Sequence, residues 1–140
     1  MANNSSIEND NCIKAFINKL ALIVEDNKVN QTILKNILLK LGFSVEIAQN
    51  GYEGYAMCGL KKYDYIFMDI HMPIMDGYLA TKQIRTTNND NSSTVIIAVT
   101  ADTLDEDCER CLKVGMNEYI AKPICLEHVK NVLQKIHLKY

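Results

Sequence analysis

Short apolar runs alternate along the chain with longer segments of helical periodicity, and this alternation limits the fold more than any other feature. Short apolar runs bounded by turn residues predict strands, and they span 20–24, 44–48, 63–68, 95–99 and 118–121. Apolar residues at helical spacing predict helices, over 28–41, 51–60, 76–86, 104–114 and 125–138. Five strands alternating with five helices predict one α/β domain, a parallel sheet with helices on both faces.

The first predicted helix, 28–41, has an apolar residue at every fourth position and ends at a glycine. These residues are Val29, Ile33, Ile37 and Leu41, followed by Gly42. A glycine directly after the last periodic residue is a common helix end.

The bulk composition is that of an ordinary soluble globular domain. The 140 residues are 48% hydrophobic and 23% charged, with a net charge of −2 and no dense basic block, so nucleic acid is not an expected partner. No apolar run approaches the ~20 residues of a membrane span, and the first residues lack the pattern of a signal peptide. We therefore expect a cytoplasmic protein whose domain makes no membrane contact.

The beginning of the chain is polar and predicts a tail. Residues 1–11 are rich in Asn, Ser and acidic side chains, a composition typical of disorder. The segment 12–19 is interpreted as a short lead-in helix or the end of a linker. We expect residues 1–18 to form a partly disordered tail or linker and residues 19–139 to form the domain.

Five cysteines are odd in number and lie mostly in apolar surroundings: Cys12, Cys58, Cys108, Cys111 and Cys125. Reduced thiols packed in the core are the favoured interpretation. Cys108 and Cys111 match C-x-x-C, but together with Leu104 and Leu112 they follow the spacing of an apolar helix stripe. Core packing is therefore favoured for this pair, and a metal or redox role is kept as the alternative.

Polar residues that could carry chemistry follow four of the apolar runs. Glu25-Asp26 follows the first, Asp69 the central one, Thr100 the fourth and Lys122 the last. Ligands bind at the carboxyl ends of the strands in a parallel α/β sheet. Three carboxylates, a hydroxyl and an ammonium at such ends predict one site for a divalent cation and a phosphoryl group.

The chemistry of these groups fits phosphoryl transfer. A carboxylate can attack a phosphoryl group to form an acyl phosphate, and Mg²⁺ offsets the repulsion between the two anions. Lys122 can pair with the phosphate as a point charge, and Thr100 can donate its hydroxyl. Each residue alone has a simpler interpretation, as a helix cap, a turn former or an exposed cation; their joint placement favours the site.

Four motifs give the chain a family resemblance: Val24-Glu25-Asp26-Asn27 with Asn30, the stretch from Met68 to Gly77, Val99-Thr100-Ala101, and Tyr119-Ile120-Ala121-Lys122-Pro123. In this combination the chain resembles a response-regulator receiver domain, the phospho-accepting module of two-component signalling, from about Lys19 to Lys139. The resemblance implies a flavodoxin-like (βα)5 fold with strand order 2-1-3-4-5.

The resemblance also implies a role for each residue at the acidic end of the site. Asp69 corresponds to the phosphorylated aspartate. Asp26 and Asp69 correspond to direct ligands of Mg²⁺ (or Mn²⁺), Glu25 to a ligand acting through water, and the backbone carbonyl of His71 to the last protein ligand. The domain is then not an enzyme in the usual sense, since it catalyses its own phosphorylation and dephosphorylation.

The same resemblance implies a conformational switch. Thr100 and Lys122 contact the phosphoryl group, Tyr119 is the aromatic residue whose ring moves with Thr100, and the Lys122–Pro123 peptide is cis. Phosphorylation is expected to reshape the face formed by the fourth helix, the fifth strand and the fifth helix.

The residues that make up these motifs resemble those in receivers attached to hybrid histidine kinases. The chain is either such a receiver or a stand-alone one. The implied partners are a histidine kinase and/or a histidine phosphotransfer protein, and the resemblance implies that they dock on the first helix, Lys28 to Leu41, beside the site. A monomer is expected, which could dimerise on phosphorylation.

Two positions differ from the commonest pattern of the family, and two other functions are alternatives. The first acid is Glu25 where many members have Asp, and Asp102, two residues after Thr100, stands where Asn is frequent and could alter the lifetime of the phosphoaspartate. The alternatives are an interaction module that works without phosphorylation and a phosphatase of the haloacid dehalogenase type. The latter needs a second Asp where this chain has His71, whose own side chain either flanks the site or faces solvent.

Overall fold

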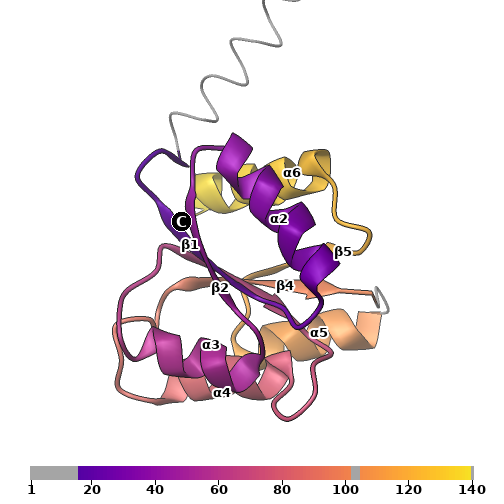
Figure 1. Cartoon of the computed structure of the whole chain (residues 1–140). Coiled ribbons are helices and arrows are strands. Elements are labelled where there is room, and N and C mark those ends of the chain that lie inside the picture. Colours follow the sequence, from indigo (N-terminus) through magenta and orange to yellow (C-terminus); the bar gives the residue numbers. More distant parts are fainter. Residues whose placement is uncertain (1–15, 102–104, 140) are drawn as a thin grey trace, which may run out of the picture.

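Five parallel strands form one sheet in the order β2-β1-β3-β4-β5 (Figure 1). The computed structural model describes residues 16–101 and 105–139. The strands are β1 (Leu20–Val24), β2 (Ser44–Ala48), β3 (Tyr65–Asp69), β4 (Val95–Thr100) and β5 (Glu118–Ala121). The α/β fold and the implied strand order are thus confirmed. The central strand begins two residues later than predicted and includes Asp69 as its last residue.

Helices cover both faces of this sheet, as the alternation predicts. They are α2 (Lys28–Lys40), α3 (Gly51–Cys58), α4 (Gly77–Thr86), α5 (Asp105–Val114) and α6 (Leu126–Lys139). Helices α2 and α6 lie on one face, and α3, α4 and α5 lie on the other (Figure 1). Over the described residues, no helix is long and apolar enough to cross a membrane.

The buried strands supply the core of both layers, which explains why they are apolar without alternation. Successive side chains point to opposite faces of a sheet. Under α3, α4 and α5 lie Leu22, Val24, Ile66, Met68, Ile96 and Ala98. Under α2 and α6 lie Ala21, Ile23, Phe67, Ile97 and Val99. Both faces of β1, β3 and β4 are therefore shielded from water, and the polar residues that follow these strands lie at the carboxyl end of the sheet.

The apolar stripe predicted for the first helix is buried at Ile37 and Leu41 but not in its first half. Val29 and Ile33 are 66% and 40% exposed, whereas Leu34, Ile37 and Leu38 are buried. A step of four residues turns the helix by 400°, so a strict four-residue repeat moves off one face within a few turns. The buried stripe follows mixed steps of three and four instead.

The cysteines differ in burial more than the core interpretation allows. Cys58 and Cys111 are buried and Cys108 is half-buried, but Cys125 is exposed, and all four are free thiols. Leu112, expected on the same stripe, is 56% exposed. Cys125 is exposed because it lies just before α6 begins, outside the stripe that this helix buries. Cys12 and Leu104 lie outside the described residues.

Phe16, in the segment expected to be a tail or linker, packs against the domain. Its ring centroid lies 4.9 Å from that of Phe43 and 6.0 Å from that of Tyr65. Its side chain is buried as a result.

Candidate functional site

The first candidate residues lie in the short connection between β1 and α2. The Glu25 N–H donates to the Ala48 carbonyl at 3.1 Å, which extends the β1–β2 pairing by one residue. Helix α2 then begins at once, because the Asn27 side chain caps it by accepting from the Asn30 N–H at 3.0 Å. Glu25 and Asp26 are therefore confined to the carboxyl end of the sheet.

Three carboxylates converge at this end. One oxygen each of Glu25, Asp26 and Asp69 lies within 4.8 Å of the others. Glu25 and Asp69 are each only 3% exposed, whereas Asp26 is exposed. The structure thus brings together all three acids that the sequence placed at strand ends.

Lys122 supplies the ammonium predicted for the site. Its Nζ lies 3.2 Å from Asp69 Oδ1 and 3.3 Å from Glu25 Oε1. Burial alone would lower the pKa of Lys122, but the nearby Asp69 and Glu25 carboxylates outweigh burial and raise it. The side chain therefore stays charged between the two buried acids.

The pKa of Glu25 is raised in this site. Burial raises its pKa, as do the hydrogen bond and the charge of Asp69, while Lys122 acts in the opposite direction. A single ammonium faces three carboxylates, so two negative charges remain uncompensated when all are ionised. Oxygen ligands with this excess charge match the preference of a divalent cation such as Mg²⁺, so the donor set fits the metal that the resemblance implies.

The loop after β3 holds the backbone of Asp69 closely. The Gly77 N–H donates to the Ile70 carbonyl at 2.8 Å, and the Ile70 N–H donates to Val99 at 3.2 Å. A side chain at Gly77 would collide with the Asp69 carbonyl oxygen. Asp76 caps α4 through Leu79, whose N–H donates to Asp76 Oδ1 at 2.8 Å. This carboxylate is used as a cap and is not a member of the acidic cluster.

The remaining predicted residues surround the cluster at different depths. Thr100 is buried at the end of β4, and its carbonyl accepts from the Lys122 N–H at 2.8 Å. Tyr119 lies with its ring outward, 39% exposed, and a hydrogen bond with the Cys108 thiol raises the pKa of its hydroxyl. The side chain of His71 is exposed. The Lys122–Pro123 peptide is cis, and Asp102 lies outside the described residues.

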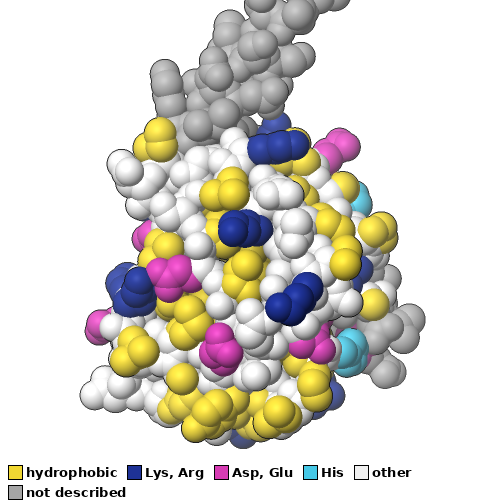
Figure 2. Space-filling view, in the orientation of Figure 1, with side chains coloured by type: hydrophobic (Ala, Val, Ile, Leu, Met, Phe, Trp, Pro, Cys, Tyr) yellow, Lys and Arg dark blue, Asp and Glu magenta, His cyan; other side chains and the backbone are white. Residues whose placement is uncertain are grey.

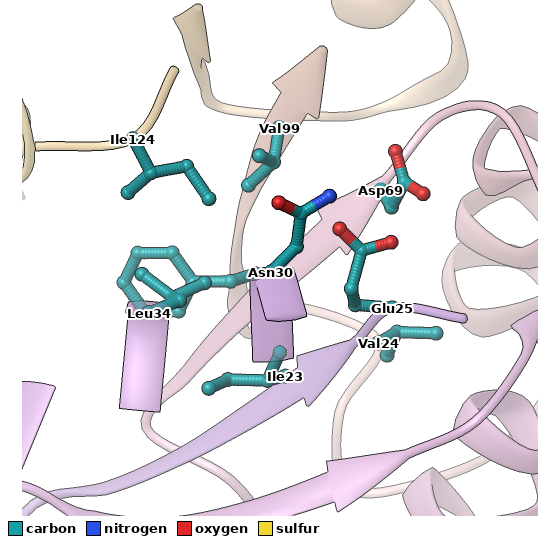
Figure 3. A pocket seen from close by; sticks show the side chains of 9 residues that line it. Ile23, Val24, Glu25, Asn30, Leu34, Asp69, Val99 and Ile124 are labelled. Atoms are coloured by element: carbon teal, nitrogen blue, oxygen red, sulfur yellow. The ribbon is translucent and has the colours of Figure 1, made fainter. Parts of the chain in front are cut away.

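Two residues of α2, Asn30 and Gln31, belong to the site, although the sequence analysis assigned no function to either of them. Asn30 lines the same pocket as Glu25 and Asp69, where its carboxamide lies beside the two carboxylates (Figure 3). Gln31 is buried and donates from Nε2 to the Glu25 carbonyl at 2.6 Å. A polar residue on the side of a helix that packs against the sheet is the signal that could have identified Gln31.

Comparison with known sequences places the chain in a well-populated family. The sequence matches the response regulator receiver domain family over residues 21–134. It is 38% identical to a probable histidine kinase 1 of Oryza sativa and 37% identical to hybrid signal transduction histidine kinase F of Dictyostelium discoideum. Each match takes in 81% of this chain but only 15% and 11%, respectively, of the two kinases.

The solved structures that resemble this chain include receiver domains of histidine kinases as well. The chain superimposes on the receiver domain of sensor histidine kinase PA1611 from Pseudomonas aeruginosa, with magnesium in the active site cleft, at a TM-score of 0.76 and 40% identity. That match covers 84% of this chain and 95% of that one. The receiver domain of the Arabidopsis thaliana histidine kinase CKI1, complexed with Mg²⁺ and BeF₃⁻, matches at a TM-score of 0.78 and 32% identity, over 91% and 95% of the two chains.

A third solved structure shows a receiver with a partner. It is the complex of the Saccharomyces cerevisiae histidine phosphotransfer protein Ypd1 with the receiver domain of Ssk1. The TM-score to that receiver is 0.77 with 32% identity, over 84% of this chain and 87% of that one.

Proposed function

The chain belongs to the family of response regulator receiver domains, and on this basis we propose that Asp69 accepts a phosphoryl group from a phosphohistidine. The observation that carries the proposal is the placement of this one carboxylate. It ends the central strand, is buried, lies with Glu25 and Asp26 within 4.8 Å, and has the Lys122 ammonium at 3.2 Å.

The proposed transfer uses the Asp69 carboxylate as the nucleophile. A carboxylate oxygen attacks phosphorus, a P–O bond forms, and the P–N bond breaks with its electron pair passing to the imidazole of the donor. Lys122 moves from its contact with Asp69 to the phosphoryl oxygens, so its charge follows the anion. The Thr100 hydroxyl donates to a phosphoryl oxygen.

The acidic cluster is proposed to hold Mg²⁺ (or Mn²⁺). Asp26 and Asp69 would bind it directly, Glu25 through water, and His71 through its backbone carbonyl. When bound, the cation supplies positive charge that reduces the repulsion between carboxylates and phosphate. Support comes from the oxygen donors, their excess charge and the magnesium in related receivers.

The switch is proposed to run from Thr100 to Tyr119. Drawing the Thr100 hydroxyl toward the phosphate vacates space beside β4, and the exposed ring of Tyr119 turns into it. Because Tyr119 lies on β5, this change would alter the face formed by α5, β5 and α6.

The proposed partner is a histidine phosphotransfer protein or histidine kinase docking over α2. This helix begins beside the acidic cluster and presents Val29 and Ile33 to solvent. Figure 2 shows basic side chains over the same region, where α2 carries Lys28, Lys35 and Lys40, all exposed. An apolar patch rimmed by positive charge suits a partner with an apolar centre and acidic edge.

The test of the acceptor is Asp69→Asn, with Asp76→Asn as the matched control. Asp69 and Asp76 lie at the two ends of the connection between β3 and α4, so each variant loses one carboxylate there, and Asn caps a helix about as well as Asp. With acetyl phosphate and Mg²⁺, Asp69→Asn should show no phosphoprotein, while Asp76→Asn should be labelled like wild type. Equal labelling of Asp69→Asn would refute the acceptor. A wild type that binds neither Mg²⁺ nor BeF₃⁻ would favour an interaction module that works without phosphorylation.

The docking face is tested by Val29→Asp and Ile33→Asp. Each should slow transfer from a phosphorylated histidine phosphotransfer protein at least tenfold, because an interface centre tolerates charge poorly. Labelling by acetyl phosphate, which needs no docking, should not change. Leu138→Asp is the control, since Leu138 is 89% exposed at the end of α6. Equal slowing by all three variants would contradict docking at α2.

A further inference from the structure

A buried glutamine of α2 joins the two loops that meet at the acidic cluster. Gln31 is 6% exposed, and its Nε2 donates to the Glu25 carbonyl at 2.6 Å and to Gln49 Oε1 at 2.9 Å. Glu25 follows β1 and Gln49 follows β2. A single amide group in the first turns of α2 therefore bonds to residues that follow two neighbouring strands.

The bond to the Glu25 carbonyl completes a clamp on the peptide between Glu25 and Asp26. On the other side of this peptide, the Asp26 N–H donates to Glu25 Oε2 at 3.1 Å. The Glu25 N–H is itself held by Ala48. With its carbonyl and its N–H both bonded, the peptide plane cannot turn freely, and its tilt sets the directions in which Glu25 and Asp26 leave the backbone.

This clamp opposes a repulsion that exists before any cation binds. Glu25 and Asp26 lie together with Asp69 in one acidic cluster, and Lys122 neutralises only part of their charge. An unrestrained loop would relax by moving the carboxylates apart. The Gln31 amide resists this as a neutral donor, so it neither competes for the cation nor cancels the charge that attracts it.

Gln49 gives the amide its orientation. Its Oε1 takes one of the two Nε2 protons of Gln31, which leaves the other proton directed at the Glu25 carbonyl. Gln49 is exposed, so it can be changed without disturbing the core.

We propose that Gln31 is a positioning residue for divalent cation binding, acting through the peptide between Glu25 and Asp26. It does not itself bind the cation. The inference rests on the proposed function, because it gives the acidic cluster the role of a cation site. Residues that orient metal ligands typically change metal affinity by about 10- to 100-fold when they are replaced.

The test compares Gln31→Leu with Thr94→Val by calorimetric titration with Mg²⁺. Each variant replaces a buried polar side chain with an apolar side chain of similar size. Thr94 precedes β4 at the amino end of the sheet, where its hydroxyl has one proton to share between Asn91 Oδ1 at 3.0 Å and the Tyr63 carbonyl at 3.2 Å. Gln31→Leu should weaken Mg²⁺ binding at least tenfold and shift the Asp26 amide resonance, while Thr94→Val should stay within twofold of wild type.

A second variant covers the case in which Gln31→Leu does not fold. Gln49→Ala removes only the orienting acceptor and should weaken Mg²⁺ binding by about threefold, the effect of one ordinary hydrogen bond. Unchanged affinity in both Gln31→Leu and Gln49→Ala would overturn the inference, and so would equal weakening by Thr94→Val. A wild-type chain without Mg²⁺ affinity would instead overturn the proposed function.

Discussion

The Lys122 ammonium lies 3.2 Å from Asp69 Oδ1 and is also paired with Glu25. The proposed nucleophile is therefore bonded to a cation before any phosphoryl group arrives. Lys122 neutralises part of the negative charge of the site in the absence of a metal, and a divalent cation has to bind beside this existing positive charge. The two cations are expected to compete electrostatically.

Lys122→Met should consequently bind Mg²⁺ more tightly than wild type. Removing a unit charge a few ångströms from the cation eliminates a repulsion of a few kcal/mol at an effective dielectric constant of about 20, part of which solvent screens, so we expect about a tenfold gain. BeF₃⁻ binding should decrease, because the anion loses its partner. Calorimetric titration measures both affinities.

The control for this prediction is Lys135→Met. Lys135 pairs with Glu118 at 3.1 Å, with 61% of its side chain exposed, on α6. The Lys135→Met variant removes the same charge far from the acidic cluster and should leave Mg²⁺ affinity unchanged. Weaker Mg²⁺ binding by Lys122→Met would show that Lys122 orders the carboxylates more than it repels the cation.

Gly77→Ala should disturb the site through the backbone. A Cβ at Gly77 would collide with the Asp69 carbonyl oxygen and lie 2.9 Å from Ile70 Cα, and backbone atoms cannot move aside as a flexible side chain can. We expect a loss of about 2 kcal/mol in the free energy of unfolding, together with weaker Mg²⁺ binding. Urea denaturation and calorimetry measure the two effects.

Gly59→Ala is the matched control. A Cβ at Gly59 would have the Ala56 carbonyl oxygen at 3.3 Å as its near neighbour, and the backbone there is already right-handed, with φ of −80°. Its stability should stay within about 0.5 kcal/mol of wild type. If Gly77→Ala behaved in the same way, the loop after β3 would be softer than its hydrogen bonds indicate.

The location of the site could be predicted from the sequence because a buried parallel strand ends abruptly. The sequence changes from apolar to charged within one residue at Val24-Glu25 and at Met68-Asp69, and these changes mark the carboxyl ends of two strands. The carboxyl ends of parallel strands all lie on one side of the sheet. A pattern of neighbouring residues therefore predicts which residues distant in the sequence come together.

The parts that could not be predicted depend on contacts distant in the sequence. Gln31 looks like a surface residue of a helix, and its burial follows from the positions of Glu25 and Gln49, which only the folded sheet brings together. The exposure of Val29 and Ile33 could not be predicted for a similar reason. Val29 and Leu34 are equally apolar, and the tilt of the helix on the sheet decides which of them is covered.

Asn91→Ala should be among the most destabilising polar substitutions. Asn91 is fully buried, and its Oδ1 accepts from the Tyr63 N–H at 2.8 Å and from Thr94 at 3.0 Å. Its Nδ2 donates to the carbonyls of Cys58 at 2.8 Å and Lys61 at 2.7 Å. Orphaning these buried groups should cost about 3 kcal/mol of unfolding free energy, measured by urea denaturation.

Asn88→Ala serves as the control for Asn91→Ala. Asn88 lies in the same loop but is exposed, so its loss should change the stability by less than about 0.5 kcal/mol. Both residues lie in the loop that precedes β4, at the amino end of the strands, whereas the acidic cluster lies at the carboxyl end. Neither variant should therefore alter Mg²⁺ affinity. A stable Asn91→Ala would mean that water replaces the amide in the loop.

Alkaline pH should destabilise the domain, because several acidic groups are buried in their neutral form. Burial raises the pKa of the Cys58 thiol from 9.0 to about 12 and that of the Tyr78 hydroxyl from 10.0 to about 12. Between these values the unfolded chain has released protons that the folded chain still holds. The contribution of Cys58 and Tyr78 to the free energy of unfolding should therefore be constant below about pH 8 and should fall from pH 9 upward.

Cys58→Ala should flatten this fall, whatever its effect on stability at neutral pH. One proton bound by the folded chain and not by the unfolded chain contributes a slope of about 1.4 kcal/mol per pH unit. Removing the Cys58 thiol should therefore make the fall less steep by up to about 1.4 kcal/mol per pH unit between pH 9 and 12. Urea denaturation at a series of pH values measures the slopes directly. Parallel curves for wild type and Cys58→Ala would show that the thiolate of Cys58 is tolerated in the folded protein, and that the core around α3 admits water at high pH.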